Sequence, residues 1–381
     1  MKGAHFPSEA HAFKDRETGV TLRQLTNYKG HSHHFYFTNA GWWDGGKRLL
    51  LGSDRNNCTD LYSLEVATGE ITQLTEHSPD TTAELLFSCV NPISDEVYFV
   101  RENRVWAMDL RTLEERVIYE LTPGFKLNIL NCTADGRYLC TGIFEDLSSK
   151  FEVDLLHGYV GFAEYCAAKP VSRIIRIPVD GSALAGEIMF EERAWIGHVN
   201  TSPQHPHLVT YCHEGPWNIV DHRIWVFDLN TGQNWKVRPA SSKDAFGHEY
   251  WLRDGETIGY HGSADGKPVF GFARYDNREL REAVMPVDSQ HFHSNTSNLI
   301  VGDGHGNKAP YILLWTWEGK KISAPRILCA HHGSRHIQQT HIHPRFTPDG
   351  GQVLFTSDRS GYGQLYLADI PALDSLPVLP V

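Results

Sequence analysis

The sequence predicts an all-β fold, a β-propeller of seven blades, and two observations support it. One strand pattern occurs seven times along the chain, and its strands carry apolar residues at alternate positions. Seven copies in 381 residues correspond to about 54 residues a copy, which is typical of a four-stranded propeller blade. The copies begin near Asp44, Asp95, Asp135, His207, Asp254, Asn298 and Phe346.

The alternation is clearest in the last copy. Val353 and Phe355, followed by Leu365 and Leu367, are typical of strands with one buried face. This copy stops after its third strand, and residues 15–26 (DRETGVTLRQLT) match the fourth-strand segment of the first copy (VATGEITQLT). We therefore expect the N-terminal strand to complete the last blade and close the ring, which removes an open sheet edge. Residues 1–381 then form a single propeller domain, and residues 144–170 are expected to include a helix inserted in the third blade.

Composition excludes several classes of protein. The chain has 35 basic and 46 acidic residues, a net charge of −11, and no basic cluster of the kind that binds nucleic acid. No apolar run approaches the roughly 18 residues of a membrane helix, and the N-terminus lacks the apolar core of a secretory signal. Seven scattered cysteines without a CxxC pair indicate reduced thiols and a cytoplasmic protein. Nothing in the sequence indicates the oligomeric state.

The positions of the histidines indicate a functional site. Four of the 22 histidines lie six residues before the turn between the first two strands of a blade. They are His198, His248, His291 and His343. Equivalent positions in propeller blades lie at equivalent places around the axis, so we expect these imidazoles to surround one end of the central channel. Loop-lined concave surfaces of this kind commonly bind ligands. Candidate substrate-binding residues on the same rim are His198, His213, Arg55, His34 and Arg359.

A metal site is predicted near the C-terminus. Gln338, His341 and His343 form the pattern Q-x-x-H-x-H, and residues i and i+2 of a strand point to the same face. His291, from the adjacent blade, can add a third imidazole, and Gln338 can add a carbonyl oxygen. Four such ligands leave coordination positions open, as catalytic sites do. The ligand types alone do not select the metal.

His248 is the candidate general base. An ordinary imidazole pKa near 6.5 suits proton abstraction around neutrality. The alternative is a structural hydrogen bond from His248 to Glu249 or to the backbone. Arg223 is always charged and can pair with a carboxylate or a developing oxyanion.

The sequence resembles the oligogalacturonate lyases along most of its length. The resemblance rests on these segments: CHEGP (212–216), VDHRIW (220–225), HEYWLRDG (248–255), VGDG (301–304) and QQTHIHPRFTPDGGQVLFTSD (from Gln338). It implies a seven-bladed propeller that binds a divalent ion, usually Mn²⁺, through His291, His341, His343 and Gln338. It also implies that His248 is the base and Arg223 its partner. The implied reaction is β-elimination of short 4-linked galacturonides, chiefly the disaccharide, to unsaturated and 5-keto-4-deoxyuronate products.

The chain departs from the family pattern at two places near the metal site. Ile342 stands between the two histidines where the family usually has proline, and His293 lies close enough to His291 to compete with it as a ligand. These departures leave open the same elimination on a different uronic-acid disaccharide. A non-enzymatic binding module is a third possibility, with Trp42, Trp43 and Trp217 as candidate anchors, but a scaffold gives no reason for four histidines in register.

Overall fold

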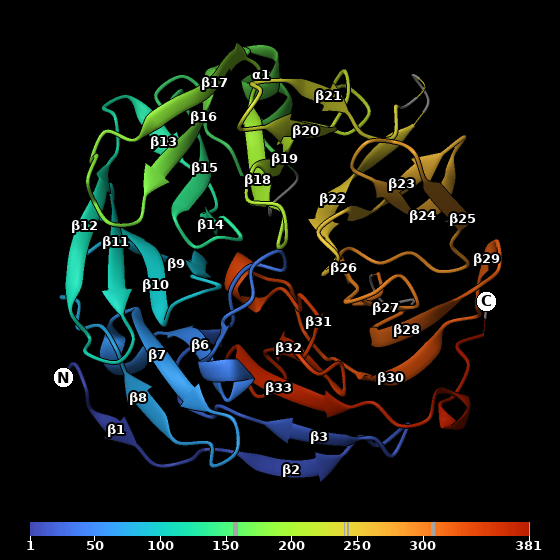
Figure 1. Cartoon of the computed structure of the whole chain (residues 1–381). Helices are drawn as coiled ribbons and strands as arrows, with labels where there is room; N and C mark the ends of the chain where they lie inside the picture. Colours follow the sequence, from blue (N-terminus) through green and yellow to red (C-terminus); the bar gives the residue numbers. More distant parts are fainter. Residues whose placement is uncertain (155–158, 240, 242–243, 306–308, 381) are drawn as a thin grey trace. The chain divides into compact units, whose positions relative to one another are not determined.

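The computed structural model describes residues 1–154, 159–239, 241, 244–305 and 309–380 (Figure 1). Its strands form seven antiparallel sheets, and these are the seven blades that the sequence predicts; the fold is an all-β propeller. The chain divides into two compact units, residues 1–86 with 283–381, and residues 87–282. No helix in these described ranges is both long and apolar enough to span a membrane.

The first unit contains three sheets. The first sheet consists of β1 (His5–Phe6), β4 (Ser32–His33), β5 (Trp42–Trp43), β6 (Arg48–Ser53), β7 (Asp60–Glu65) and β8 (Ile71–Gln73), with the 3-10 turns η1 (Asp44–Gly46) and η2 (Arg55–Asn57). The second consists of β26 (Phe292–His293), β27 (Leu299–Gly302), β28 (Tyr311–Glu318), β29 (Lys321–Ile322) and β30 (Arg326–Ala330). The third consists of β2 (His11–Lys14), β3 (Thr21–Gln24), β31 (Arg345–Phe346), β32 (Gln352–Ser357) and β33 (Gln364–Asp369), with η4 (Gln338–Thr340) and η5 (Leu373–Ser375).

The second unit contains four sheets, and its first and last strands cross the boundary between the units. The first of these sheets consists of β9 (Ala83–Val90), β10 (Glu96–Arg101), β11 (Arg104–Asp109) and β12 (Glu115–Glu120), and the second of β13 (Phe125–Leu127), β14 (Asn131–Cys132), β15 (Tyr138–Glu145), β16 (Val171–Pro178) and β17 (Glu187–Arg193). The third consists of β18 (Ile196–Thr201), β19 (Leu208–His213), β20 (Ile224–Asp228) and β21 (Asn234–Lys236). The fourth consists of β22 (Ala245–Trp251), β23 (Thr257–Ala264), β24 (Lys267–Arg274) and β25 (Leu280–Val284).

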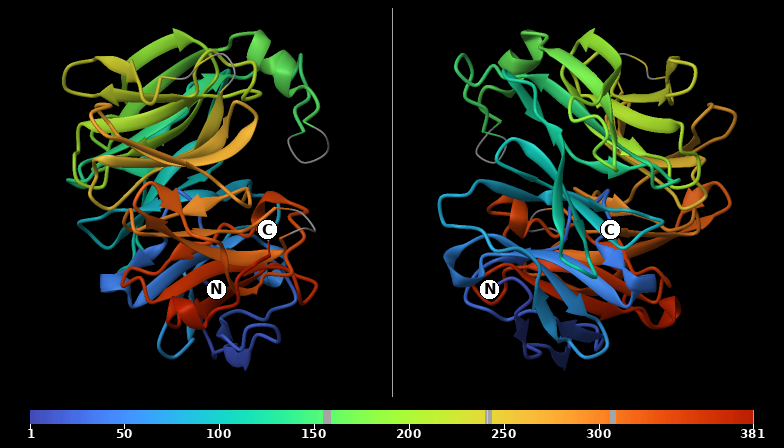
Figure 2. Two further views of the ribbon diagram at one scale, coloured as in Figure 1. Left: turned by 90° about the vertical axis from the view of Figure 1, so that its right-hand side faces the viewer. Right: turned by 60° about the vertical axis from the view of Figure 1, so that its left-hand side comes forward.

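The two ends of the chain meet in one sheet. Strand β3 pairs antiparallel with β33, with Leu22 opposite Ala368 and Gln24 opposite Tyr366, and β2 pairs on the outer side of β3. The dark blue β2 and β3 lie beside the red β33 in the ribbon views (Figures 1 and 2). The segment 15–26 therefore supplies a strand to the sheet of the last repeat.

The core of the first unit shows why the sequence forms these sheets. Alternate residues of β6 and β7, such as Leu49, Leu51 and Leu64, pack against Leu354 and Leu367 of the last sheet, and each is at most 1% exposed. Each such side chain contributes about 1.5–3 kcal/mol through burial. The expectation of one buried face is wrong for these inner strands, because the intervening Leu50 and Tyr366 are buried as well and each strand packs on both faces.

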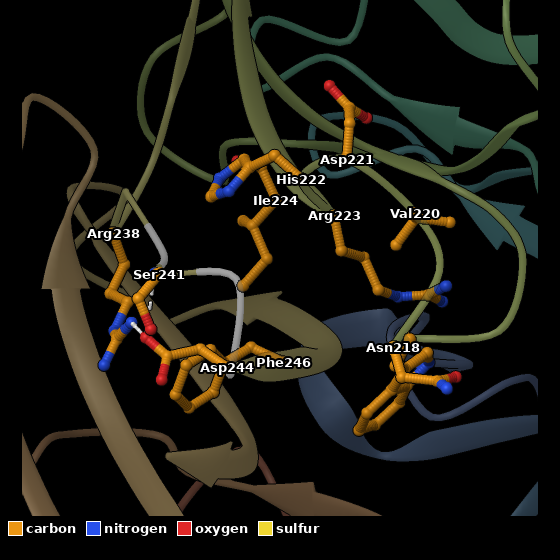
Figure 3. Close-up of a pocket in the computed structure, with 11 residues that line it drawn as sticks. Asn218, Val220, Asp221, His222, Arg223, Ile224, Arg238, Ser241, Asp244 and Phe246 are labelled. Atoms are coloured by element: carbon orange, nitrogen blue, oxygen red, sulfur yellow. Dashed lines mark hydrogen bonds and ion pairs between the residues drawn. The ribbon is translucent and has the colours of Figure 1, made fainter. Parts of the chain in front are cut away.

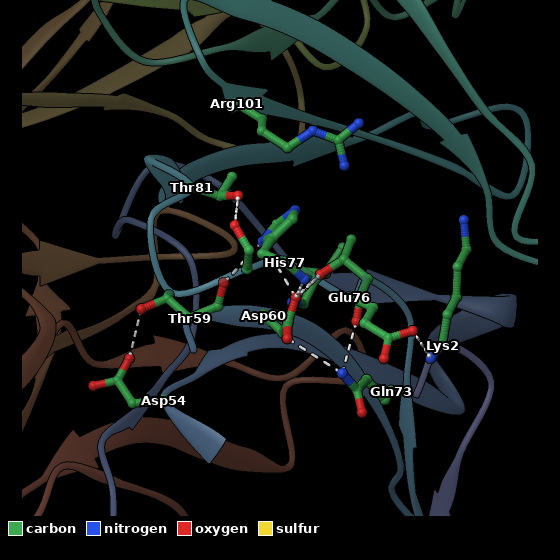
Figure 4. Close-up of polar contacts among 12 residues, drawn as sticks. Lys2, Asp54, Thr59, Asp60, Gln73, Glu76, His77, Thr81 and Arg101 are labelled. Atoms are coloured by element: carbon green, nitrogen blue, oxygen red, sulfur yellow. Dashed lines mark hydrogen bonds and ion pairs between the residues drawn. The ribbon is translucent and has the colours of Figure 1, made fainter. Parts of the chain in front are cut away.

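Buried polar groups tie the first sheet to the loop that follows it (Figure 4). The Asp60 carboxylate accepts hydrogen bonds from the Thr75 hydroxyl (2.7 Å), the His77 backbone N–H (3.0 Å) and the Gln73 amide (3.2 Å). Burial raises the pKa of Asp60, and these donors oppose that rise. The Asp60 carboxylate thus pairs with three donors at the end of the sheet, as expected because buried polar groups are normally hydrogen-bonded.

The expected insertion holds one short helix. Helix α1 (Phe162–Ala167) packs Phe162 and Tyr165 against Trp195, with 4.5 Å between the ring centroids of Tyr165 and Trp195. The Tyr165 hydroxyl donates to the Glu145 carbonyl oxygen at 2.6 Å. The green helix lies at an end of its unit (Figure 2). Residues 155–158 of the insertion lie outside the described residues.

Candidate active site

Three histidines meet in the first unit. His291, His341 and His343 each offer one ligand atom, and these atoms lie within 4.8 Å of one another. The ring centroids of His291 and His343 are 4.3 Å apart, and both rings lie 5.4–5.6 Å from that of His341. His291 and His343 are buried and His341 is half-buried. The three imidazoles that the sequence predicts as ligands are thus brought together.

The backbone places His341 and His343 differently from the expected strand. Both precede β31, in a segment without regular structure, and His343 has a left-handed backbone with φ 43°. Ile342, between them, is fully buried in the apolar core that includes Val301 and Phe346. Because the Ile342 side chain points into the core, the side chains of His341 and His343 both point away from it. They therefore lie on the same side of the segment, although it is not a strand.

Gln338, shortly before His341 in the same segment, offers a side-chain oxygen as a candidate ligand atom. It begins η4, and its Oε1 atom is buried and receives no hydrogen bond within the described ranges of the chain. The Nδ1 atom of His341 is also buried and makes no hydrogen bond there. Buried polar atoms are normally paired, so these two atoms fit a bound cation. The donor set of imidazoles and an amide oxygen is suited to zinc, manganese or a similar divalent metal.

His293 has a different environment from His291. Its Nδ1 accepts a hydrogen bond from the backbone N–H of Phe346 at 3.3 Å, and its ring packs on the Phe346 ring. Of the two histidines, the described residues place His291 but not His293 in the group with His341 and His343 that can hold a metal.

Asp303 orients His291. The Nδ1 of His291 lies 2.9 Å from Oδ2 of Asp303, whose Oδ1 accepts the His291 backbone N–H, also at 2.9 Å. Burial alone would raise the pKa of Asp303, but His291 and Arg335 lower it below its usual range. A carboxylate on one ring nitrogen leaves the other nitrogen for a cation. Sequence reasoning missed this role, although Asp303 lies in the VGDG segment.

Replacing this carboxylate should weaken metal binding. We expect Asp303→Asn to lower Mn²⁺ affinity about 10- to 100-fold, because the imidazole loses its negatively charged partner. Calorimetric titration of the metal-free protein with Mn²⁺ measures the change. Asp369→Asn, at an exposed position in β33, is the control and should bind like the wild type. Equal affinity in both variants would contradict the role of Asp303.

His34 lies beside the metal group. It is 3% exposed, and its ring centroid is 6.3 Å from that of His343. Burial, reinforced by the charge of Arg345, lowers the pKa of His34 to about 3. Burial, reinforced by His291, lowers the pKa of His341 to about 4. Both rings are therefore neutral at pH 7, and neutral imidazole is the form that binds metals.

These lowered pKa values make the stability of the metal-free protein depend on pH. The unfolded chain, in which histidine has a pKa near 6.5, binds protons that the folded His34 excludes. The free energy of unfolding is therefore highest above pH 6.5. It decreases as the pH is lowered below 6.5, by about 1.4 kcal/mol per pH unit for one such histidine. Urea unfolding measures the free energy of unfolding at pH 6 and at pH 5. The decrease between the two should be smaller for His34→Gln than for the wild type. Identical pH dependence in both proteins would contradict this expectation.

His198 and His248 form a second group, in the other unit. Each lies in a β-bulge, of β18 and β22 respectively, with φ 45° and 51°. Each follows a glycine that allows close packing: a Cβ on Gly197 would lie 2.8 Å from Oε2 of Glu214, and one on Gly247 would lie 2.6 Å from Nε of Arg223. Non-glycine residues in the left-handed region are uncommon and cluster at functional sites. His198, His248 and His343 share both this conformation and the repeat position.

The structure gives His248 an unexpected partner. Its Nδ1 lies 2.9 Å from Nε2 of His261, and the Trp217 ring meets its ring edge-on at a centroid distance of 5.1 Å. The alternative prediction, a hydrogen bond from His248 to Glu249 or to the backbone, is wrong for Glu249, because the described residues give neither Glu249 oxygen a hydrogen bond; for the backbone it stays a prediction. His261 lies thirteen residues along the chain on β23, and no motif in the sequence identifies it.

Arg223 is held in place by a carboxylate. It is 5% exposed, and Nη1 and Nη2 donate to the two oxygens of Glu214 at 2.9 and 3.3 Å. Burial alone would raise the pKa of Glu214, but the charge of Arg223 lowers it to about 2. Arg223 and Asn218 also line a small pocket, which Arg238 and Asp244 border with an ion pair (Figure 3).

Three other candidates are engaged in contacts of their own. Arg55 is 2% exposed and donates two hydrogen bonds to Glu9, at 2.6 and 2.8 Å. His213 has Asp221 at 2.7 Å from Nδ1 and Glu192 at 2.9 Å from Nε2. Arg359 stacks over Phe13 and lines a different pocket. The proposed site does not use these three residues, and their binding of substrate stays a prediction.

Known proteins match the chain over nearly its whole length. The model of the oligogalacturonate lyase family matches residues 1–374. The chain is 30% identical to the oligogalacturonide lyase of Pectobacterium atrosepticum and 29% identical to the oligogalacturonate lyase of Dickeya dadantii, each over 97% of this chain and 98% of the relative. The structure of an oligogalacturonate lyase from Vibrio parahaemolyticus superposes with a TM-score of 0.87 at 27% identity, covering 97% of this chain and 99% of that one. An oligogalacturonate lyase in complex with manganese matches with the same TM-score and identity, over 97% of this chain and 98% of that one. The chain belongs to the oligogalacturonate lyase family of enzymes.

Proposed function

We propose that the chain cleaves short 4-linked galacturonides, chiefly the disaccharide, by β-elimination to unsaturated and 5-keto-4-deoxyuronate products. The observation that carries this proposal is the group of three imidazoles, His291, His341 and His343, with ligand atoms within 4.8 Å, in a chain of this family. A uronate needs a cation because its C5 proton is poorly acidic while the neighbouring carboxylate is a free anion.

We propose Mn²⁺ as the cation, held by the three histidines and Gln338. A solved family structure is a manganese complex, and the buried Oε1 of Gln338 fits an oxygen-preferring metal. When bound, the ion supplies positive charge that acts on the substrate carboxylate as a Lewis acid. Asp303 fixes the orientation of His291, and the buried Ile342 anchors the segment that carries the other two histidines.

His248 is the proposed base, and Arg223 binds the anionic substrate. His261 contacts Nδ1 of His248, which leaves Nε2 to take the C5 proton. Nη1 and Nη2 of Arg223 donate to Glu214, but its Nε receives no partner among the described residues and can donate to a carboxylate or a developing oxyanion. Glu214 holds that guanidinium in one orientation.

The departure at Ile342 gives little support to a different uronide. The Ile342 side chain is fully buried in the apolar core, so it offers no contact to a sugar. A binding module without catalysis gives no role to the buried polar atoms of Gln338 and His341. We also propose a cytoplasmic location, which the seven cysteines support, since all of them are free.

The test is the ultraviolet absorbance of the unsaturated product. Purified protein with one equivalent of Mn²⁺ should generate this absorbance from digalacturonate, lose the activity on chelation, and regain it when Mn²⁺ is restored. A panel of other 4-linked uronate disaccharides serves as the comparison. Turnover of another uronide but not of digalacturonate would overturn the substrate assignment. Absence of turnover with every uronide, in metal-loaded protein, would overturn the proposed function.

A further inference from the structure

A half-buried carboxyl group, that of Glu214, and a buried one, that of Glu249, flank His198, and the mechanism above gives Glu249 no role. Nε2 of His198 lies 4.0 Å from Oε2 of Glu214, and Nδ1 lies 3.9 Å from Oε1 of Glu249. Glu249 has no exposed surface, and its two oxygens receive no hydrogen bond in the described part of the chain. A buried carboxyl group without hydrogen bonds is costly, so its presence beside an imidazole calls for an explanation, which a function would supply.

His198 also lies next to the proposed base. The ring centroids of His198 and His248 are 6.5 Å apart, and the ring planes differ by 26°. Elimination removes the hydrogen on C5 and breaks the C–O bond on the neighbouring C4. A base and an acid that serve these two atoms must therefore lie within about the span of one sugar ring, and these two histidines do.

We propose that His198 is the proton donor of the elimination, a role that rests on the proposed function. His248 takes the C5 proton, and the electron pair of that C–H bond forms the C4=C5 double bond. The C4–O bond breaks with its electron pair on the leaving oxygen, which receives the proton of the His198 imidazolium. His248 ends with one proton more and His198 with one proton fewer, and exchange with water restores both.

The charges around His198 suit a proton donor. Glu214 is ionised at neutral pH, because the charge of Arg223 outweighs burial and lowers the pKa of Glu214 to about 2. Its negative charge faces Nε2 and favours the imidazolium. Burial raises the pKa of Glu249 to about 7, so its carboxyl group can exchange a proton near neutrality beside Nδ1. Glu249 is a positioning residue, since it acts through His198.

A second metal site is the rival interpretation of the same residues. His198, Cys212 and Glu249 each offer a ligand atom within 4.8 Å of the others. The guanidinium of Arg223 interacts with both Cys212 and Glu249, and its positive charge opposes a cation there. Burial raises the pKa of the Cys212 thiol well above its usual value, so the thiolate that a metal needs is disfavoured.

Two variants of the full-length, Mn²⁺-loaded protein test the proposal. His198→Asn keeps a residue that tolerates the left-handed backbone, and Glu249→Gln keeps the shape of the side chain while removing the acid. His332→Asn, at an exposed histidine with φ 51°, is the matched control. The measurement is kcat for digalacturonate between pH 5 and 10, with a Zn²⁺ titration of each protein.

The expected result is specific to a proton donor. The wild type loses kcat on the alkaline side as His198 loses its proton. His198→Asn lowers kcat about 10²-fold and abolishes this alkaline decline. Glu249→Gln moves the decline to lower pH by about one unit, because the imidazolium loses a nearby negative charge. The control keeps the wild-type profile.

Several results would overturn the proposal. They are a wild-type profile without an alkaline decline, a kcat for His198→Asn within about threefold of the wild type, or an unchanged alkaline decline in either variant. Stoichiometric Zn²⁺ binding that depends on Glu249 would replace it with the second metal site. Wild-type protein that turns over no uronide would instead refute the proposed function, whereas wild-type turnover with unaffected variants refutes this inference alone.

Discussion

His248→Asn is expected to lower kcat for digalacturonate by about 10²–10⁴-fold, the usual contribution of a general base. Asparagine is chosen because residue 248 has φ 51°, a conformation that asparagine tolerates better than most residues. The amide cannot accept the C5 proton, so the loss falls on the chemical step. Affinity for Mn²⁺ should stay unchanged, because none of the proposed ligands is altered.

Two readouts separate this role from a structural one. Saturation kinetics should show the loss in kcat with KM nearly constant, as expected for an interaction made only in the transition state. Thermal unfolding of the variant should match that of His332→Asn, which introduces the same residue in the same backbone conformation. A kcat within about threefold of the wild type would contradict the assignment of His248 as base.

The strand pattern made the fold predictable because apolar residues at alternate positions mark strands, although it did not reveal that inner strands are buried on both faces. Leu49, Leu51 and Leu64 lie where the repeat places buried residues, and each is fully buried. The pairing of β3 with β33 could be predicted for the same reason, since residues 15–26 repeat the fourth strand of the first copy. The division of the chain into two compact units could not be predicted. The strand pattern is the same on both sides of the boundary between the units, so it does not mark that boundary.

The candidate site was predictable only where repeat position or motif marked its residues. His291, His341 and His343 were found by register and spacing, and the structure brings them together. The partners that orient these histidines were missed. His261 contacts His248 from β23, and Asp303 contacts His291 from the loop after β27. These contacts depend on the packing of side chains from neighbouring strands, which spacing along one chain does not encode.

Two other candidates have partners that the sequence does not reveal, for the same reason. Arg55 and His213 were proposed to bind substrate because the topology places their loops on the histidine-bearing side of a blade. The structure instead gives Arg55 the carboxylate of Glu9, and it gives His213 the carboxylates of Glu192 and Asp221. These carboxylate partners lie elsewhere in the sequence, so the pattern around Arg55 and His213 does not reveal them.

The metal site leads to the second prediction with a large effect. His343→Asn should lower Mn²⁺ affinity by at least about 100-fold and abolish turnover at one equivalent of metal, because it removes a buried imidazole from a set of three. Asparagine again suits the left-handed backbone, here with φ 43°. Calorimetric titration with Mn²⁺ and elemental analysis of the dialysed protein measure the loss directly.

Thermal unfolding gives an independent readout that needs no substrate. Mn²⁺ at 100 times its Kd should stabilise the wild type by about 2.7 kcal/mol, a rise in Tm of about 3 °C for a chain of this size. His343→Asn should show almost no rise at the same concentration, whereas His332→Asn should respond like the wild type. An equal rise in Tm for His343→Asn and the wild type would place the cation elsewhere, and the base at His248 would then need a different source of charge on the substrate carboxylate.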